Sequence, residues 1–210
     1  MQKRYLILLP IAGIGCFFGL YGVAALLYPG GSQHDTKALG FSWRHNYWCN
    51  LLNETGMNGH PNPGQPFALA AMIVLSFSLG LFWFSLPRLI STGFVPRAAV
   101  HLSGMLVLIP FIFIPWVGHD IMIYLSGLVA TIAMTGTLTA LFLQKWYRLF
   151  TLGIFCVLLM IVNNIFYHTI SLLRYLPIVQ KISFVVFLGW ICFVALKLYH
   201  LARRHTSTKK

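Results

Sequence analysis

The chain has 210 residues, of which 58% are hydrophobic and only 9% are charged. Soluble globular domains carry about 25% charged residues, so this composition excludes a water-soluble enzyme, and its hydrophobicity excludes a disordered chain. The formal net charge of +12 does not indicate a nucleic-acid-binding protein, because the basic residues stand singly between apolar runs and not on one basic face. The composition predicts a polytopic, all-α membrane protein surrounded by the lipid bilayer.

An α-helix needs about 20 predominantly apolar residues to cross the hydrocarbon core of a bilayer. Six segments meet this requirement, and in chain order they are residues 5–28, 67–86, 98–117, 120–143, 149–173 and 182–201. We expect these six transmembrane helices to form one bundle, a single membrane domain of residues 1–210. The connection at residues 29–66 is the longest, and we expect it to be an ordered outer loop. Its aromatic residues suit a cap at the membrane interface: Phe41, Trp43, Tyr47 and Trp48.

The distribution of basic residues predicts the orientation of the spans. With the N-terminus in the cytoplasm, eleven of the 15 Lys and Arg residues fall on the cytoplasmic side. The other four fall outside: Lys37, Arg44, Arg174 and Lys181. This is the positive-inside bias. It predicts a multi-pass protein of the cell membrane with both termini in the cytoplasm.

Acidic residues are rare, and the predicted topology brings them together. All three of them fall on the outer side: Asp35, Glu54 and Asp120. Five of the eight histidines fall on the same side: His34, His45, His60, His119 and His168. The sequence therefore predicts a polar pocket at the exoplasmic end of the bundle.

Two of these histidines and one carboxylate indicate a metal site. His119 and Asp120 stand together at the start of the fourth span, and His168 lies in the outer half of the fifth. Two imidazoles and a carboxylate suit zinc with an open position for water, or non-haem iron. We predict His119 and His168 as metal ligands and Asp120 as the catalytic residue. A structural alternative is that Asp120 stabilises a helix N-terminus and that His168 forms an interhelical hydrogen bond.

Five further residues are predicted to line the pocket or support the ligands: Asn46, Asn50, Glu54, Asn163 and Asn164. The first three would share the polar face of a short helix within residues 44–54. Asn164 precedes His168 by four residues and therefore shares its helix face. From there it would orient the imidazole ring.

Several short motifs lie in the loop and at the start of the fourth span. They are Tyr28-Pro29-Gly30-Gly31, Gly40-Phe41-Ser42, Asn46-Tyr47-Trp48-Cys49-Asn50-Leu51, Asn58-Gly59, Pro61-Asn62 and His119-Asp120. In these motifs and in the order of its spans the chain resembles a family of uncharacterised six-span bacterial integral membrane proteins, a domain of unknown function. The resemblance implies six helices and a polar outer pocket, with no established activity. More distantly, the chain is similar to membrane hydrolases of the alkaline ceramidase type, which implies a zinc ion held by histidines.

These observations leave two main functions open. One is a metal-dependent lipid hydrolase that acts in the outward-facing pocket with zinc or iron. The other is a non-enzymatic membrane subunit or lipid-binding protein. In that case the aromatic loop and the third span, kinked at Pro110, would hold a membrane-protein partner or a lipid tail. A third possibility, a b-type haem between His119 and His168, predicts a coloured protein.

Overall fold

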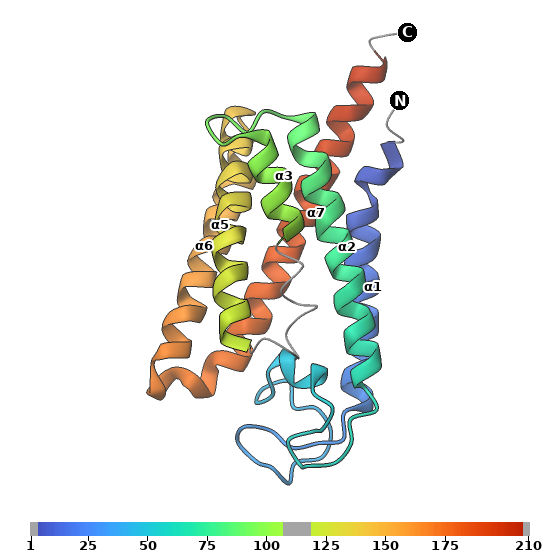
Figure 1. Ribbon diagram of the computed structural model, residues 1–210, viewed down its shortest axis with the longest axis vertical. Coiled ribbons are helices and arrows are strands. Elements are labelled where there is room, and N and C mark those ends of the chain that lie inside the picture. The colour runs from blue at the N-terminus through green and yellow to red at the C-terminus, as the bar shows by residue number, and fades with distance from the viewer. Residues whose placement is uncertain (1–3, 107–118, 208–210) are drawn as a thin grey trace. The chain divides into compact units, whose positions relative to one another are not determined.

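The computed structural model describes the backbone of residues 4–106 and 119–207, and the side chains of residues 5–106 and 124–204 (Figure 1). Apart from two isolated β-bridges, the regular structure of these residues is helical, which confirms the predicted all-α class. The α-helices of this part of the chain are α1 (Leu9–Leu27), α2 (Gln65–Leu89), α3 (Arg97–Leu106), α5 (His119–Leu143), α6 (Tyr147–His168) and α7 (Leu176–Ser207). Short 3₁₀ helices accompany them: η1 (Arg4–Ile7), η2 (Trp48–Leu52) and η3 (Ile170–Tyr175).

Within the described ranges, five helical segments are long and apolar enough to cross a membrane. They are Tyr5–Leu27, Gln65–Leu89, Tyr124–Leu143, Tyr147–His168 and Ile170–Arg204. These segments correspond to five of the six predicted spans. The third predicted span, residues 98–117, begins as α3. Residues 107–118, with Pro110, lie outside the described residues, so this span and its kink stay predictions.

The last helix begins earlier than the sequence predicted. We expected the fifth span to reach residue 173 and the sixth to begin at residue 182, but η3 follows a shorter α6, and α7 begins at Leu176. Pro177 favours this start, because a proline in the first turn of a helix lacks only an amide hydrogen that would have no intrahelical acceptor. Lys181 therefore lies on a helix and not in a loop.

Contacts between residues divide the chain into two compact units. Unit 1 consists of Met1–Ile14, Leu75–Ile154 and Trp190–Lys210, and unit 2 consists of Gly15–Val74 and Phe155–Gly189. Helices α1, α2, α6 and α7 each contribute residues to both units. The predicted polar residues of the long loop and of α6 belong to unit 2, whereas α3 and α5 belong to unit 1.

Unit 1 is held together where small residues meet large ones. Helix α3 packs against α5, and Gly136 of α5 lies directly against the fully buried Val100. Gly104 of α3 lies so close to Trp83 of α2 that a Cβ atom there would overlap the indole. The indole N–H of Trp83 donates to Thr137 Oγ1 at 3.2 Å. Such close approach at small residues is typical of helix packing in membranes, where van der Waals contact drives association.

Unit 2 has an aromatic core. Trp48 of η2 is 8% exposed, and its ring centroid lies 5.6 Å from that of Tyr21 and 5.3 Å from that of Phe184. The fully buried Phe17 lies 6.1 Å from the same ring. These edge-to-face arrangements are favourable for aromatic pairs. Trp48 thus packs in the protein core, whereas Trp43 is 58% exposed. The place of the long loop at the membrane interface stays a prediction.

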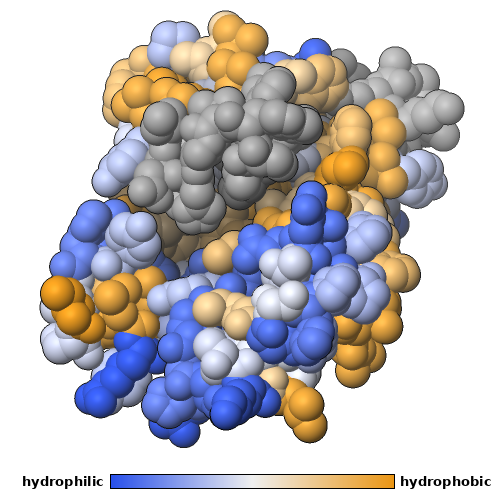
Figure 2. Space-filling view, turned by 60° about the horizontal axis from the view of Figure 1, so that its bottom comes forward, coloured by the Kyte–Doolittle hydropathy of each residue, from blue (hydrophilic) through white to orange (hydrophobic). Residues whose placement is uncertain are grey.

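Large apolar side chains are exposed on the long helices. The most exposed include Leu26 at 87%, Phe77 at 72% and Leu128 at 67%. Figure 2 shows hydrophilic residues gathered on the face in view, with hydrophobic surface at its flanks. Soluble monomers rarely expose extended apolar surface. The distribution is therefore the one expected of helices that face hydrocarbon.

Candidate functional site

The residues between α1 and α2, residues 28–64, form a folded loop that we call the cap. Its two ends are joined where the Asn58 N–H donates to the Gly30 carbonyl at 3.3 Å. Gly30 and Gly31 have φ values of +128° and +80°, and a Cβ atom on Gly31 would overlap the backbone of Met57. Glycine is required at such positions because it alone combines positive φ with so close an approach.

Asn46 is a buried organiser of the cap. Its side chain is 0% exposed. The Oδ1 atom accepts the backbone N–H of Ser42 at 2.8 Å, and Nδ2 donates to the Gly31 carbonyl at 2.8 Å. Both ends of this amide are therefore used to hold two separate stretches of the cap together.

Asn50 and Asn62 act in the same way. Asn50 Oδ1 accepts the Tyr47 N–H at 2.6 Å and the Gln33 side-chain amide at 3.1 Å. Asn62 donates to two backbone carbonyls, those of residues 51 and 53, at 3.1 and 2.9 Å. Its Oδ1 accepts the Gly64 N–H at 3.0 Å. These buried amides satisfy backbone groups that the irregular chain leaves without partners.

The predicted short helix in residues 44–54 is wrong in type and length. The segment forms only η2, a 3₁₀ helix of five residues, so Asn46 precedes it and does not share a helix face with Asn50. Glu54 lies beyond η2 and its side chain is exposed. Asn50 stabilises the start of η2, because its side chain accepts the N–H of Tyr47, the residue that precedes the helix.

Lys181 and Gln180 fasten the cap to α7. Lys181 is 9% exposed, and its Nζ donates to the Asn46 carbonyl at 2.5 Å and to the Pro177 carbonyl at 3.0 Å. Gln180 Oε1 accepts the Trp48 N–H at 3.2 Å. A buried ammonium group is costly unless it is hydrogen-bonded. Here backbone carbonyls meet that need.

The sequence predicted for Lys181 only a place on the outer side of the membrane and not this role. A signal was present, because Lys181 follows Pro177 by four residues within an apolar segment and so points along the same face as the first helical turn. A lysine in such a place requires polar acceptors. The loop that supplies the acceptor cannot be read from the sequence, since Asn46 lies 135 residues away in the chain.

Burial governs the titration of the cap's thiol and phenols. It raises the pKa of the Cys49 thiol, and this outweighs the nearby Lys181 charge, which lowers the pKa. The thiolate is the reactive form of cysteine, so Cys49 stays protonated and weakly nucleophilic at neutral pH. Burial also raises the pKa of Tyr47 and of Tyr28, whose hydroxyl accepts the Met57 N–H at 3.0 Å. These neutral groups favour a structural role.

Two of the histidines expected to gather on one side do lie together in the cap. The rings of His34 and His45 stack with a centroid distance of 4.9 Å. His45 Nδ1 also lies 3.3 Å from Ser42 Oγ. The stack is part of the cap's surface, since His34 is exposed and His45 is half-buried.

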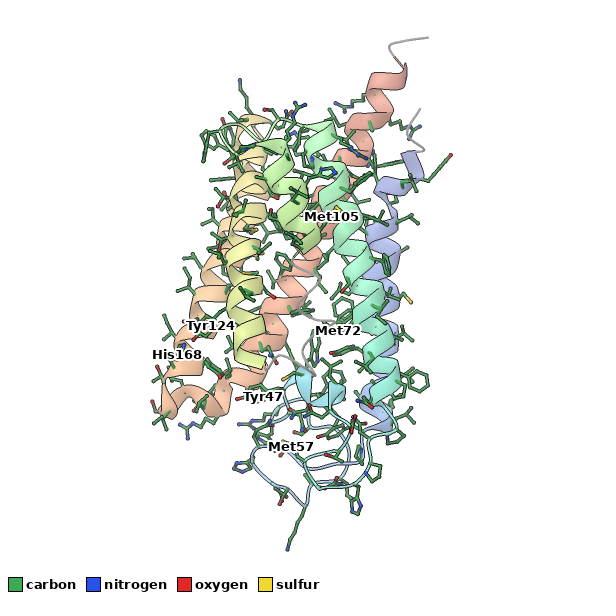
Figure 3. All side chains as sticks on the ribbon, viewed as in Figure 1. Tyr47, Met57, Met72, Met105, Tyr124 and His168 are labelled. Atoms are coloured by element: carbon green, nitrogen blue, oxygen red, sulfur yellow. The ribbon has the colours of Figure 1, made fainter. Side chains whose placement is uncertain are left out.

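The predicted polar residues of α6 separate into two groups. Asn163 Nδ2 donates to a carbonyl of its own helix at 3.0 Å and to Ser183 Oγ on α7. Asn164 and His168 are exposed, and Figure 3 shows His168 at the end of α6. The His168 ring meets Tyr167 edge to face at 5.1 Å. The structure thus joins Asn163 to α7 and leaves the other two side chains on the surface.

The predicted metal ligands are described only in part. Among the described side chains, no group of three or more His, Cys, Asp and Glu residues is arranged to hold a metal ion. His119 and Asp120 are the first two residues of α5, but their side chains lie outside the described residues. The set of His119, Asp120 and His168 therefore stays a prediction, as does zinc or iron bound to it.

Comparisons of the chain with protein-family models, curated proteins and solved structures find no match. The family resemblance and the distant similarity to membrane hydrolases therefore stay expectations based on short motifs.

Proposed function

We propose that the chain is a six-span integral protein of the cell membrane that binds lipid without catalysing a reaction. Its termini lie in the cytoplasm and the cap lies at the exoplasmic face. The exposed apolar side chains of the long helices carry this proposal, because such a surface matches hydrocarbon and not water. The excess of Lys and Arg in the segments assigned to the cytoplasm supports the orientation.

The hydrogen bonding of the cap supports a structural role for its polar residues. The side-chain amides of Asn46, Asn50 and Asn62 already bond cap backbone, so a ligand would have to open the cap to reach them. Lys181 is bonded to the cap in the same manner. These bonds stabilise the cap itself, so we assign the lipid contacts to the exposed apolar side chains of the helices.

Retention of lipid through purification tests this function. The protein is extracted in a mild detergent, passed through size exclusion and analysed for phospholipid per chain. We expect phospholipid in stoichiometric amount, because bound lipid exchanges slowly with detergent. A folded chain that retains none would contradict lipid binding. A chain that leaves the membrane in an alkaline carbonate wash would contradict the membrane-spanning part of the proposal.

A metal-dependent lipid hydrolase is the second candidate. It is favoured by the placing of His119 and Asp120 together as the first residues of α5, with His168 as a further ligand and zinc or iron as the metal. Asp120 would then act as ligand or base, and the metal would lower the pKa of a bound water. Elemental analysis of the purified protein beside its His119→Ala variant tests it. Stoichiometric metal that the variant loses would support hydrolysis, and equal metal content in both proteins would refute it.

A further inference from the structure

The connection between α5 and α6 holds a lysine where glycine is usual. Lys145 has φ = 57°, the left-handed conformation that closes many helices. Its N–H donates to the Phe142 carbonyl at 2.9 Å, and the Trp146 N–H donates to the Leu141 carbonyl at 2.9 Å. This pair of bonds is a Schellman motif. Glycine adopts the conformation without steric cost, so the lysine here adopts a backbone conformation that its side chain disfavours.

Lys145 lines a cleft in unit 1. The cleft has a volume of about 420 Å³ and is formed by the α5–α6 connection, the start of α6 and the C-terminal part of α7. Its polar lining is basic, and the cationic and imidazole side chains come from Lys145, Arg148, Lys197 and His200. Trp146 and Tyr147 also line it, and Lys197 Nζ lies 5.6 Å from the Trp146 ring centroid.

The lining of this cleft changes from apolar to basic along α7. Phe193, Leu196, Lys197 and His200 all line it, and their spacing of three, four and seven residues puts them on one helix face. Phe193 and Leu196 are 56% and 39% exposed. Tryptophan and tyrosine beside such a transition are typical of the level of lipid headgroups. The face therefore matches a molecule with an acyl chain and a charged head.

No described carboxylate neutralises these cations. Asp35 and Glu54 belong to the cap, and Asp120 begins α5. At about 1.5 Å per residue, Asp120 stands about 37 Å along the helix from Lys145. Among the described side chains of unit 1, these cations therefore have no carboxylate to offset their charge, which favours an anionic ligand.

We propose that this cleft binds the phosphate headgroup of an anionic membrane phospholipid. Lys145, Arg148 and Lys197 contact the phosphate, His200 lies at the outer rim, and an acyl chain runs along Phe193 and Leu196. The inference rests on the proposed function, because it requires the C-terminal part of α7 to lie at the level of the cytoplasmic headgroups. Basic pockets between helices on that side of a membrane are suited to anionic headgroups.

The double variant Lys145→Gly and Lys197→Gln tests the site. Phosphatidylglycerol and phosphatidylcholine are titrated separately into the purified protein in detergent, and bound lipid is counted by native mass spectrometry. Each basic residue near a headgroup contributes about a factor of five in affinity. We expect the variant to bind phosphatidylglycerol about 25-fold more weakly and phosphatidylcholine as before.

Two controls separate the site from general effects. Arg203→Gln removes an exposed charge from the same helix without lining the cleft, so we expect unchanged binding of phosphatidylglycerol. Lys145→Gly alone places glycine at the left-handed position and should raise the unfolding temperature while it weakens lipid binding. A loss of affinity in this variant therefore cannot come from misfolding.

Three results would overturn the inference. They are equal affinity of the wild type for the two lipids, wild-type affinity in the double variant, and an equal loss in Arg203→Gln. The protein can show one of these results and still resist the alkaline wash and retain phosphatidylcholine. That outcome would refute lipid binding in the cleft but not the proposed function. A chain released by the wash refutes both.

Discussion

Replacing Lys181 by methionine should loosen the cap from α7. The ammonium group donates to the Asn46 carbonyl at 2.5 Å, and Lys181→Met removes this donor while keeping a side chain of similar length. The Asn46 carbonyl then loses its partner in a buried part of unit 2. The Pro177 carbonyl loses a second donor, but it remains within the hydrogen-bonded backbone of α7.

The size of the effect follows from two opposing contributions. A buried acceptor left without a partner costs about 1–3 kcal/mol. Removing the ammonium group also removes its desolvation cost, which offsets part of that loss. We expect the cap to be weakened by about 1–2 kcal/mol, which raises the equilibrium constant for its opening by about 5–30-fold.

The reactivity of Cys49 reports this opening. Cys49 lies in η2 between Trp48, whose N–H bonds α7, and Asn50. Its side chain is half-buried and burial raises the pKa of its thiol, so opening of the cap should expose the thiol and increase its reactive thiolate form. When opening is fast relative to labelling, the rate follows the equilibrium constant. We expect Lys181→Met to speed labelling of Cys49, identified by peptide mass spectrometry, by the same 5–30-fold factor.

Arg174→Met is the matched control. It removes the same charge from an exposed side chain that stacks on Tyr175 at 4.6 Å. Surface changes of this kind alter stability by less than about 0.5 kcal/mol, so labelling should stay within about twofold of the wild type. A Lys181→Met variant that labels no faster than this control would refute the assigned role of Lys181.

Two further predictions concern packing and pH. Gly104→Ala should lower the stability of the detergent-solubilised protein by about 1–3 kcal/mol, because the added Cβ would overlap Trp83. Gly127→Ala adds a Cβ atom that would meet no packing neighbour within 4 Å, so it should leave the unfolding temperature unchanged or raised. Equal effects of the two variants in thermal unfolding would contradict the packing. Because burial raises the pKa of Cys49 above its ordinary value of 9.0, the stabilisation from its protonated thiol is complete below pH 9 and is lost as the pH rises through the folded-state pKa. When unfolding is measured between pH 8 and 11, Cys49→Ser should lose less stability with rising pH than the wild type does. Identical pH profiles of the two proteins would contradict the raised pKa of Cys49.

The long helices could be predicted from the sequence because apolar run length is a direct physical requirement for crossing a bilayer. Their ends could not. Run length predicts that the last span begins at residue 182, yet α7 begins at Leu176. Pro177 favours the earlier start, and the Asn46 carbonyl of the cap accepts a hydrogen bond from Lys181 in the first turns of α7. A hydropathy profile shows neither feature.

The candidate site was predictable in composition and not in arrangement. The sequence predicts that Asn46 and Asn50 line the pocket because they are polar residues of the loop. Only the structure shows that their side-chain amides are hydrogen-bonded to backbone groups of the cap. A helical period predicted a shared face, whereas η2 is a short 3₁₀ helix. Tryptophan is typical of membrane interfaces, but Trp48 lies in the protein core, where Phe17 and Phe184 from distant segments pack against it. Such long-range contacts leave no local pattern in the sequence.

The side of the membrane on which the cap lies tests the central claim most directly. Single cysteines are introduced by Thr36→Cys in the cap and Ser91→Cys between α2 and α3, both at exposed positions, and intact cells are treated with a membrane-impermeant maleimide. Peptide mass spectrometry then scores each introduced cysteine. The account predicts that Thr36→Cys is labelled in intact cells and that Ser91→Cys is labelled only after permeabilisation. Labelling of the Ser91→Cys variant in intact cells would contradict this orientation, whether or not the Thr36→Cys variant is labelled too.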